Sequence, residues 1–102
     1  MSGPWLHIVR VDVDPAQEAE FNRWYEAEHI PALLACPGWL SARRFTVEDG
    51  GPRHAAVYEI AGPWVYDTPE FQAAKGFFHL TPHVRNFMRQ VLAPLPSGVD
   101  PA

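Results

Sequence analysis

The sequence predicts an α+β domain built on one antiparallel sheet. Alternation of apolar and polar side chains indicates strands over residues 5–13, 39–48 and 54–61. Capping residues and helical spacing indicate one helix between the first two strands and another after the third. The order β-α-β-β-α, closed by a possible further strand, is the ferredoxin-like βαββαβ arrangement, whose sheet carries helices on one face only. The bare face needs a cover, and a second copy of the chain is the simplest one.

Length, charge and cysteine content narrow the possible functions. The 102 residues fit one domain, which we place at residues 1–93, followed by a loose, Pro-rich tail at 94–102. Eight Lys and Arg against twelve Asp and Glu give a net charge of −4, and the chain has no basic cluster, which argues against nucleic acid as a partner. Cys36 is the single cysteine, so we expect neither a disulfide framework nor a Cys-based metal site. No signal peptide is recognisable and no apolar run approaches ~20 residues, so we expect a cytoplasmic protein without membrane contact.

The first strand, residues 5–13, carries apolar side chains on both faces, so we expect it to be buried on part of both sides. His7 and Arg10 point to opposite faces of this strand. The helix that follows begins at Asp14, which suits the N-cap position because a proline comes next, and it runs to about Glu28.

The stretch FNRWYEAEHIP, residues 21–31, combines aromatic, acidic and imidazole side chains. Helical spacing places its aromatic residues and Glu28 on one side of the helix. Pro31 lacks an amide donor, so the regular helix should break or kink near His29. An imidazole at a helix end, with an ordinary pKa near ~6.5, could serve as acid or base at neutral pH. The alternative is structural: the aromatic residues are core and His29 caps the helix C-terminus.

The second and third strands should form a hairpin, because DGGP at residues 49–52 is a strong turn signal. Alternation in the second strand puts Trp39 and Arg43 on one face and Arg44 on the other. The segment Asp67-Thr68-Pro69-Glu70 then offers a cap for a short helix, with Pro69 near its start, that runs to about Lys75. Residues 84–92 are compatible with either a helix or a strand, and their periodicity does not decide between the two.

Five short motifs follow one another along the chain: DVDP at 12–15, F-N-x-W-Y-x-x-E-H-x-P-x-L-L at 21–34, P-G-x-x-S-A-R-R-F at 37–45, Y-E at 58–59 and P-H-V-R-N-F at 82–87. Together they span about residues 5–92, and they resemble the small EthD-like proteins of the dimeric α+β barrel superfamily. The resemblance implies that residues 84–92 form the fourth strand. It also implies that two chains join their sheets back to back into a barrel.

The resemblance further implies chemistry on a small molecule. The superfamily includes cofactor-free monooxygenases of aromatic polyketides, cyclases, isomerases, decarboxylases and haem-degrading enzymes. We therefore predict a homodimeric, cofactor-independent enzyme acting on an apolar aromatic or polyketide-like substrate. The alternative is a non-catalytic ligand-binding or accessory protein of the same fold. A third hypothesis is haem binding through a histidine.

The candidate catalytic residues are His29 as acid or base, with Arg43 and Tyr58 as stabilisers of an oxyanion. Arg44 is the alternative to Arg43, because alternation turns one of the pair to solvent. The predicted substrate contacts are Trp24, Tyr25, Trp39, His79, His83, Asn86, Phe87 and Met88. His79 and His83 are four residues apart, but a proline lies between them and a third ligand is missing, so no metal site is predicted. The chain has no Gly-rich phosphate loop, so no nucleotide or flavin is expected.

Overall fold

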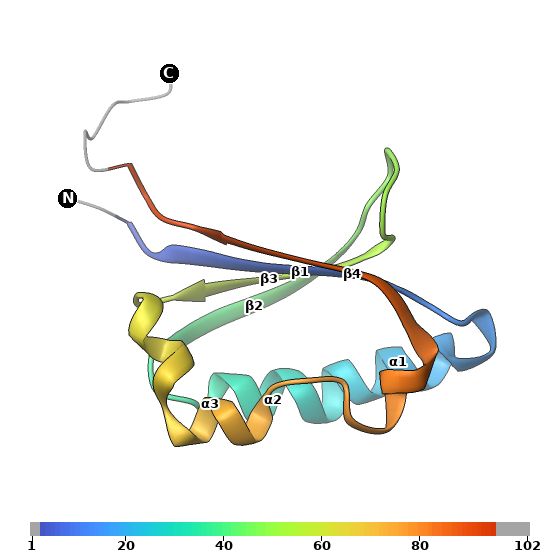
Figure 1. Ribbon diagram of the computed structural model, residues 1–102, viewed down its shortest axis with the longest axis horizontal. Helices are drawn as coiled ribbons and strands as arrows, with labels where there is room; N and C mark the ends of the chain where they lie inside the picture. The colour runs from blue at the N-terminus through green and yellow to red at the C-terminus, as the bar shows by residue number, and fades with distance from the viewer. Residues whose placement is uncertain (1–2, 96–102) are drawn as a thin grey trace.

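A computed structural model describes residues 3–95, so most of the predicted tail at 94–102 lies outside the described residues. The described elements are β1 (Trp5–Val13), α1 (Glu18–Trp24), α2 (Ile30–Leu34), β2 (Trp39–Thr46), β3 (His54–Ile60), α3 (Pro69–Ala74) and β4 (Val84–Leu92). The four strands form one antiparallel sheet in the order β2-β3-β1-β4. All the helices lie on one face of this sheet (Figure 1). The ferredoxin-like fold class is therefore confirmed, including the fourth strand.

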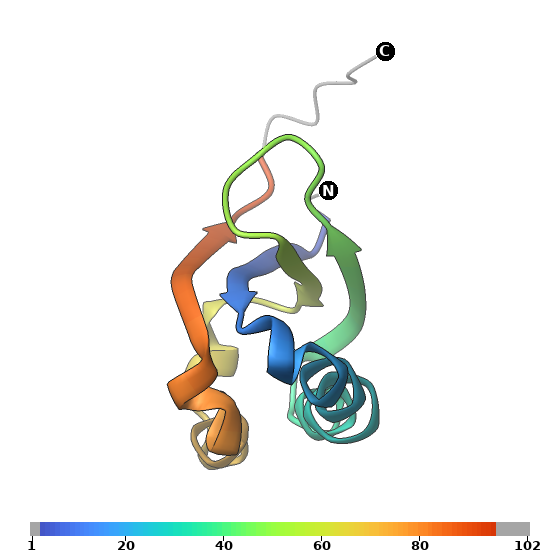
Figure 2. The same cartoon turned by 90° about the vertical axis from the view of Figure 1, so that its right-hand side faces the viewer.

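The sheet curves over the helices, as Figure 2 shows in a view along the strands. The α1–α2 segment and α3 lie beneath the arch, and the core fills the space between the two layers. Its largest fully buried side chains are Tyr58, Phe21, Ile60, Leu80, Val11 and Val65. No helix of the described residues covers the other face of the sheet. Within residues 3–95, no helix is long and apolar enough to cross a membrane.

The irregularity predicted near His29 is present, but it is a π-helical turn and not a break in the helix. A π-helical turn, Tyr25–His29, joins α1 to α2 without interruption. The amide of Ile30 donates to the carbonyl of Tyr25, five residues back rather than four. The hydrogen-bond register changes just before Pro31, so the missing donor falls where the ladder is already interrupted.

The π-helical turn also shifts the inward face of the helix by one residue. Glu28 was predicted to lie on the side of Phe21, but its side chain is 56% exposed and pairs with Arg23 at 2.8 Å. His29 takes the inward position and is buried. The alternative role of His29 as a C-terminal cap is wrong as well, because the helix continues past it to Leu34.

Two irregularities in the sheet change which side chains face the helices. A shift in the β2–β3 register between Trp39 and Ser41 puts Trp39 on the helix side, together with Ala42 and Arg44 rather than with Arg43. A bulge in β4 lies opposite Arg10–Asp12, where Asn86 has a φ of 57°. Beyond this bulge, alternate side chains of β4 face the helix layer.

The caps of the two helical segments have different partners. Asp14 occupies the predicted N-cap position, but its carboxylate makes no capping hydrogen bond and instead contacts Arg85 and His83. Thr68 caps α3 as predicted, because its hydroxyl oxygen accepts from the amide of Phe71 at 3.1 Å.

Candidate functional site

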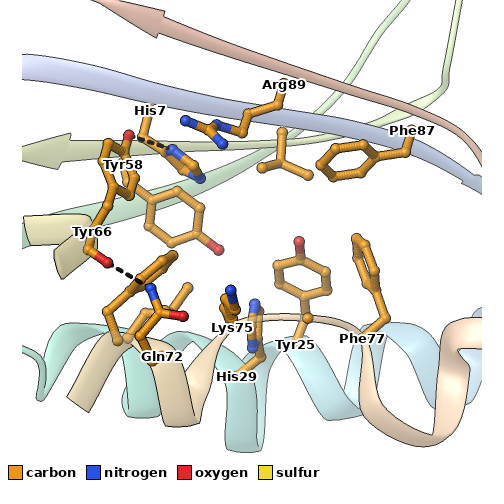
Figure 3. Close-up of a pocket in the computed structure, with 14 residues that line it drawn as sticks. His7, Tyr25, His29, Tyr58, Tyr66, Gln72, Lys75, Phe77, Phe87 and Arg89 are labelled. Atoms are coloured by element: carbon orange, nitrogen blue, oxygen red, sulfur yellow. Dashed lines mark hydrogen bonds between the residues drawn. The ribbon is translucent and has the colours of Figure 1, made fainter. Parts of the chain in front are cut away.

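A cavity of about 530 Å³ lies between the sheet and the helix layer. β1, β3 and β4 form one wall, and the π-helical turn, α2 and the segment around α3 form the other (Figure 3). Its lining residues are His7, Val9, Tyr25, His29, Leu33, Tyr58, Tyr66, Phe71, Gln72, Lys75, Gly76, Phe77, Phe87 and Arg89. Most of them are aromatic or apolar, as is usual for a pocket that holds a small organic molecule.

His29 presents a neutral imidazole to this cavity. Its ring stacks on Trp24 with centroids 4.4 Å apart and meets Tyr25 edge-on at 5.1 Å. Residues five apart on a regular α-helix point about 140° apart, so the π-helical turn is what allows Trp24 and His29 to stack. Burial lowers the pKa of His29 to about 4, and the ring is therefore uncharged at neutral pH.

His7 is a second buried histidine in the cavity wall. Its Nδ1 atom lies 2.8 Å from the hydroxyl oxygen of Tyr66, and its ring meets Trp39 edge-on at 5.1 Å. Burial, with the nearby Arg89 as a further cause, lowers the pKa of His7 to about 4. The hydrogen bond from one ring nitrogen fixes the ring orientation, which leaves the other nitrogen as a defined polar contact.

Two phenols, those of Tyr25 and Tyr58, extend into the cavity from opposite walls (Figure 3). Tyr58 is 1% exposed, and no group in the described part of the chain meets its hydroxyl in normal hydrogen-bond geometry, although the phenol of Tyr25 is close enough to influence its pKa. Burial raises the pKa of Tyr25 to about 12 and that of Tyr58 further, so both phenols stay protonated. An unpartnered buried hydroxyl is costly, and a ligand oxygen that accepts its proton would remove that cost.

The polar groups nearer to solvent are cationic. Arg89, on β4, lies with its guanidinium carbon 4.9 Å from the centre of the Tyr66 ring, and Lys75 follows α3. Both side chains are exposed and line the cavity, as Figure 3 shows.

Four of the predicted site residues line the cavity: His29, Tyr25, Tyr58 and Phe87. Two more stand behind the wall. Trp24 supports His29 by stacking, and Trp39 packs between His7 and Phe71, with the Phe71 ring stacked at 5.2 Å.

The remaining predicted residues lie elsewhere. Arg43 is exposed on the helix-free face of the sheet, because the irregularity at the start of β2 reverses the expected alternation. Arg44 is on the helix side, but it donates to Asn22 at 2.7 Å and covers the Tyr25 ring from outside the cavity.

The residues predicted from the late segment are mostly bound to carboxylates. His79 contacts Glu20 at 2.7 Å, His83 contacts Asp14 at 3.2 Å, and Asn86 donates to Asp12 at 2.9 Å. Met88 pairs with Arg10 and lies on the helix-free face. Among the described residues, no three His, Cys, Asp or Glu side chains gather in a way that could hold a metal ion.

Sequence reasoning missed the other ten residues that line the cavity: His7, Val9, Leu33, Tyr66, Phe71, Gln72, Lys75, Gly76, Phe77 and Arg89. His7 and Arg89 could have been found from the register, because His7 is opposite Tyr58 on β3 and Arg89 is opposite Val9 on β1. The residues between 66 and 77 lie in turns and in a six-residue helix, where no periodicity indicates their direction.

No family model matches the chain, and no curated protein matches it. Solved structures do match. HapK from Hahella chejuensis has a TM-score of 0.71 at 14% identity and covers 96% of this chain and 99% of its own. The heme-degrader MhuD from Mycobacterium tuberculosis, with two hemes bound in its active site, has a TM-score of 0.66 at 17% identity and covers 95% and 100%.

An EthD family protein from Bacillus halodurans also matches, with a TM-score of 0.61 at 11% identity over 84% of this chain and 96% of its own. Structural likeness at such low sequence identity establishes the fold alone. The activity has to be argued from the residues that line the cavity. The chain therefore has the ferredoxin-like fold that these solved structures share.

Proposed function

We propose that this protein is a small-molecule enzyme that takes an apolar aromatic substrate into the cavity and uses His29 as the proton acceptor. The observation that carries the proposal is the neutral imidazole of His29, which lines an open aromatic cavity together with two protonated phenols and an arginine. A protein that only binds its ligand needs an open cavity as well, but it does not need a base there. The presence of a neutral imidazole, two phenols and an arginine in the lining of one cavity favours catalysis.

The chemistry would begin with a proton leaving an acidic C–H or O–H bond of the substrate. The electron pair stays on the substrate, the proton goes to the imidazole of His29, and the hydroxyl of Tyr58 donates to the oxygen on which negative charge collects. A pKa near about 4 keeps His29 in its base form, but it also makes the imidazolium costly. The substrate anion formed beside the imidazolium offsets part of that cost through their mutual attraction.

Deuterium exchange tests this proposal without knowledge of the natural reaction. 2-Tetralone is an aromatic ketone with an acidic C–H bond, and NMR measures the deuterium it takes up from D₂O. The native protein should accelerate the uptake, and His29→Gln should abolish the acceleration. The matched control is His54→Gln, which removes a histidine that pairs with Glu18 outside this cavity. Acceleration that survives in His29→Gln would show that His29 is not the base. Binding of 2-tetralone without any exchange would favour the non-catalytic alternative.

We also propose that the protein is a homodimer in which the helix-free face of the sheet is covered by a second copy. This face carries Ile8, Val57, Phe45 and Met88, and the last two are 45% and 41% exposed. Apolar surface of this kind on a sheet favours association. Native mass spectrometry should give twice the chain mass of 11.5 kDa, whereas a monomer would contradict the proposal. The same spectrum would report any small molecule that copurifies.

Haem binding is the second candidate function, because two histidines that could coordinate haem iron line the cavity. Neutral imidazoles are the usual axial ligands of haem iron, and both His7 and His29 are neutral and line the cavity. Haem would supply redox chemistry with dioxygen. Titration with hemin should then produce a shifted Soret band that His7→Gln or His29→Gln removes, and a spectrum equal to that of free hemin would exclude this function.

A further inference from the structure

We propose that the cavity selects aromatic molecules that carry a carboxylate, with the carboxylate attracted by the exposed Arg89 and Lys75 and the ring placed inside. This inference rests on the proposed function in that it uses the same cavity, and it adds the charge and orientation of the substrate.

The charged residues that line the cavity are both cations. The chain has twelve acidic residues against eight Lys and Arg, yet no Asp or Glu is among the fourteen lining residues, all of which lie in the described part of the chain. Arg89 and Lys75 are the charged lining residues. His7 and His29 add no charge near neutral pH, since burial lowers both pKa values to about 4. A protein with net charge −4 thus presents a cationic cavity mouth, which attracts anions locally.

Neither Arg89 nor Lys75 is paired with a carboxylate in the described part of the chain. Among residues 3–95, neither Arg89 nor Lys75 makes an ion pair, whereas Arg23, Arg44 and Arg85 each contact a carboxylate. The guanidinium of Arg89 lies over the ring of Tyr66 instead. A guanidinium carries five N–H groups, so donors remain for a carboxylate even though Arg89 also acts on the Tyr66 hydroxyl and its pKa as a neighbouring cation and donor.

The lining changes from charged and exposed side chains at the mouth of the cavity to uncharged and buried side chains in its interior. Arg89 and Lys75 are exposed, while the side chains of Tyr58, His7 and His29 behind them are buried and uncharged. Phe77 and Phe87 meet edge-on at 6.1 Å and form one aromatic wall. The buried hydroxyl of Tyr58, close to the phenol of Tyr25, is a polar group deeper inside. A molecule with a carboxylate at one end and an aromatic body at the other matches this arrangement, because each part meets groups of the complementary kind.

Matched ligands test the proposal directly. 2-Naphthoate and 2-naphthamide have nearly the same shape and differ in charge, and isothermal titration calorimetry gives the Kd of each. We expect 2-naphthoate to bind about tenfold more tightly, since each exposed cation contributes up to about fivefold. Arg89→Gln and Lys75→Gln should each weaken 2-naphthoate by about two- to fivefold and leave 2-naphthamide unchanged. Raising the salt concentration should weaken 2-naphthoate alone.

Arg53→Gln is the charge-matched control, because it removes an exposed arginine that does not line this cavity. It should leave both Kd values unchanged, and circular dichroism should show that all three variants retain the fold. If both ligands bind equally well to every variant, the charge preference is refuted while the cavity and the proposed function stand. If neither ligand binds, the cavity does not take aromatic molecules, and both proposals fail.

Discussion

Acidification should destabilise this protein through its two buried histidines. His7 and His29 have pKa values near about 4 in the folded protein, and both would titrate near ~6.5 once unfolded. Between these values the unfolded chain binds protons that the folded chain does not, so the free energy of unfolding falls as the pH falls. From pH 7 to pH 5 the loss is about 2 kcal/mol for each histidine and about 3–4 kcal/mol for both.

Urea unfolding at pH 7 and pH 5, followed by tryptophan fluorescence, measures this loss. His7→Gln and His29→Gln should each remove about half of the difference between the two pH values, and the double variant should remove most of it. Val65→Ala is the control, because it truncates a fully buried side chain that does not titrate. It should lower stability equally at both pH values. If both histidine variants keep the full wild-type difference, the inference of buried neutral imidazoles is wrong.

Three further predictions concern stability, and thermal or urea denaturation checks each of them. Arg44→Met should lower the free energy of unfolding by about 1–2 kcal/mol, because it removes a hydrogen bond and the cation over the Tyr25 ring. The exposed Arg43→Met should change this free energy by no more than about 0.5 kcal/mol. Equal effects of the two substitutions would contradict the assignment of faces in β2. Tyr58→Phe should stabilise the ligand-free protein by up to about 1 kcal/mol, since it removes an unpartnered buried hydroxyl, and a clear loss would reveal a partner. Gly38→Ala should lower the free energy of unfolding by more than about 2 kcal/mol, because Gly38 has a φ of 82° and an added Cβ would lie 2.4 Å from a side-chain carbon of Val65. Gly50 has a φ of 111° but open space around it, so Gly50→Ala should lower this free energy by about 1–2 kcal/mol.

The fold was predictable because its strands alternate regularly over most of their length. The element order follows from three strand patterns, a Thr cap and a Pro-Gly-rich turn, all of which are local signals. The fourth strand was not decided by pattern, because residues 84–92 alternate on both sides of a bulge at which the phase changes. Only the likeness to a family supplied that element.

The cavity was predictable in part, and each miss has a local physical cause. Arg43 was chosen because simple alternation continues through Leu40, where the structure shifts register. Glu28 was placed inward because the pattern assumes 3.6 residues per turn, which the π-helical turn does not keep. Pro31 was the available signal for that turn, and it indicated the right place but the wrong kind of irregularity. Tyr66 and Lys75 contact the cavity from segments without a repeating pattern.

The bulge at Asn86 gives β4 one more residue than β1 has over the same length of the pair. On both sides of it the residues keep regular partners, with Arg85 opposite Asp12 and Arg89 opposite Val9. Deleting the extra residue would therefore restore plain alternation in β4 without moving Arg89 to the other face of the sheet. Chains of this architecture can thus differ in length by one residue at this position and still present the same β4 side chains to the cavity.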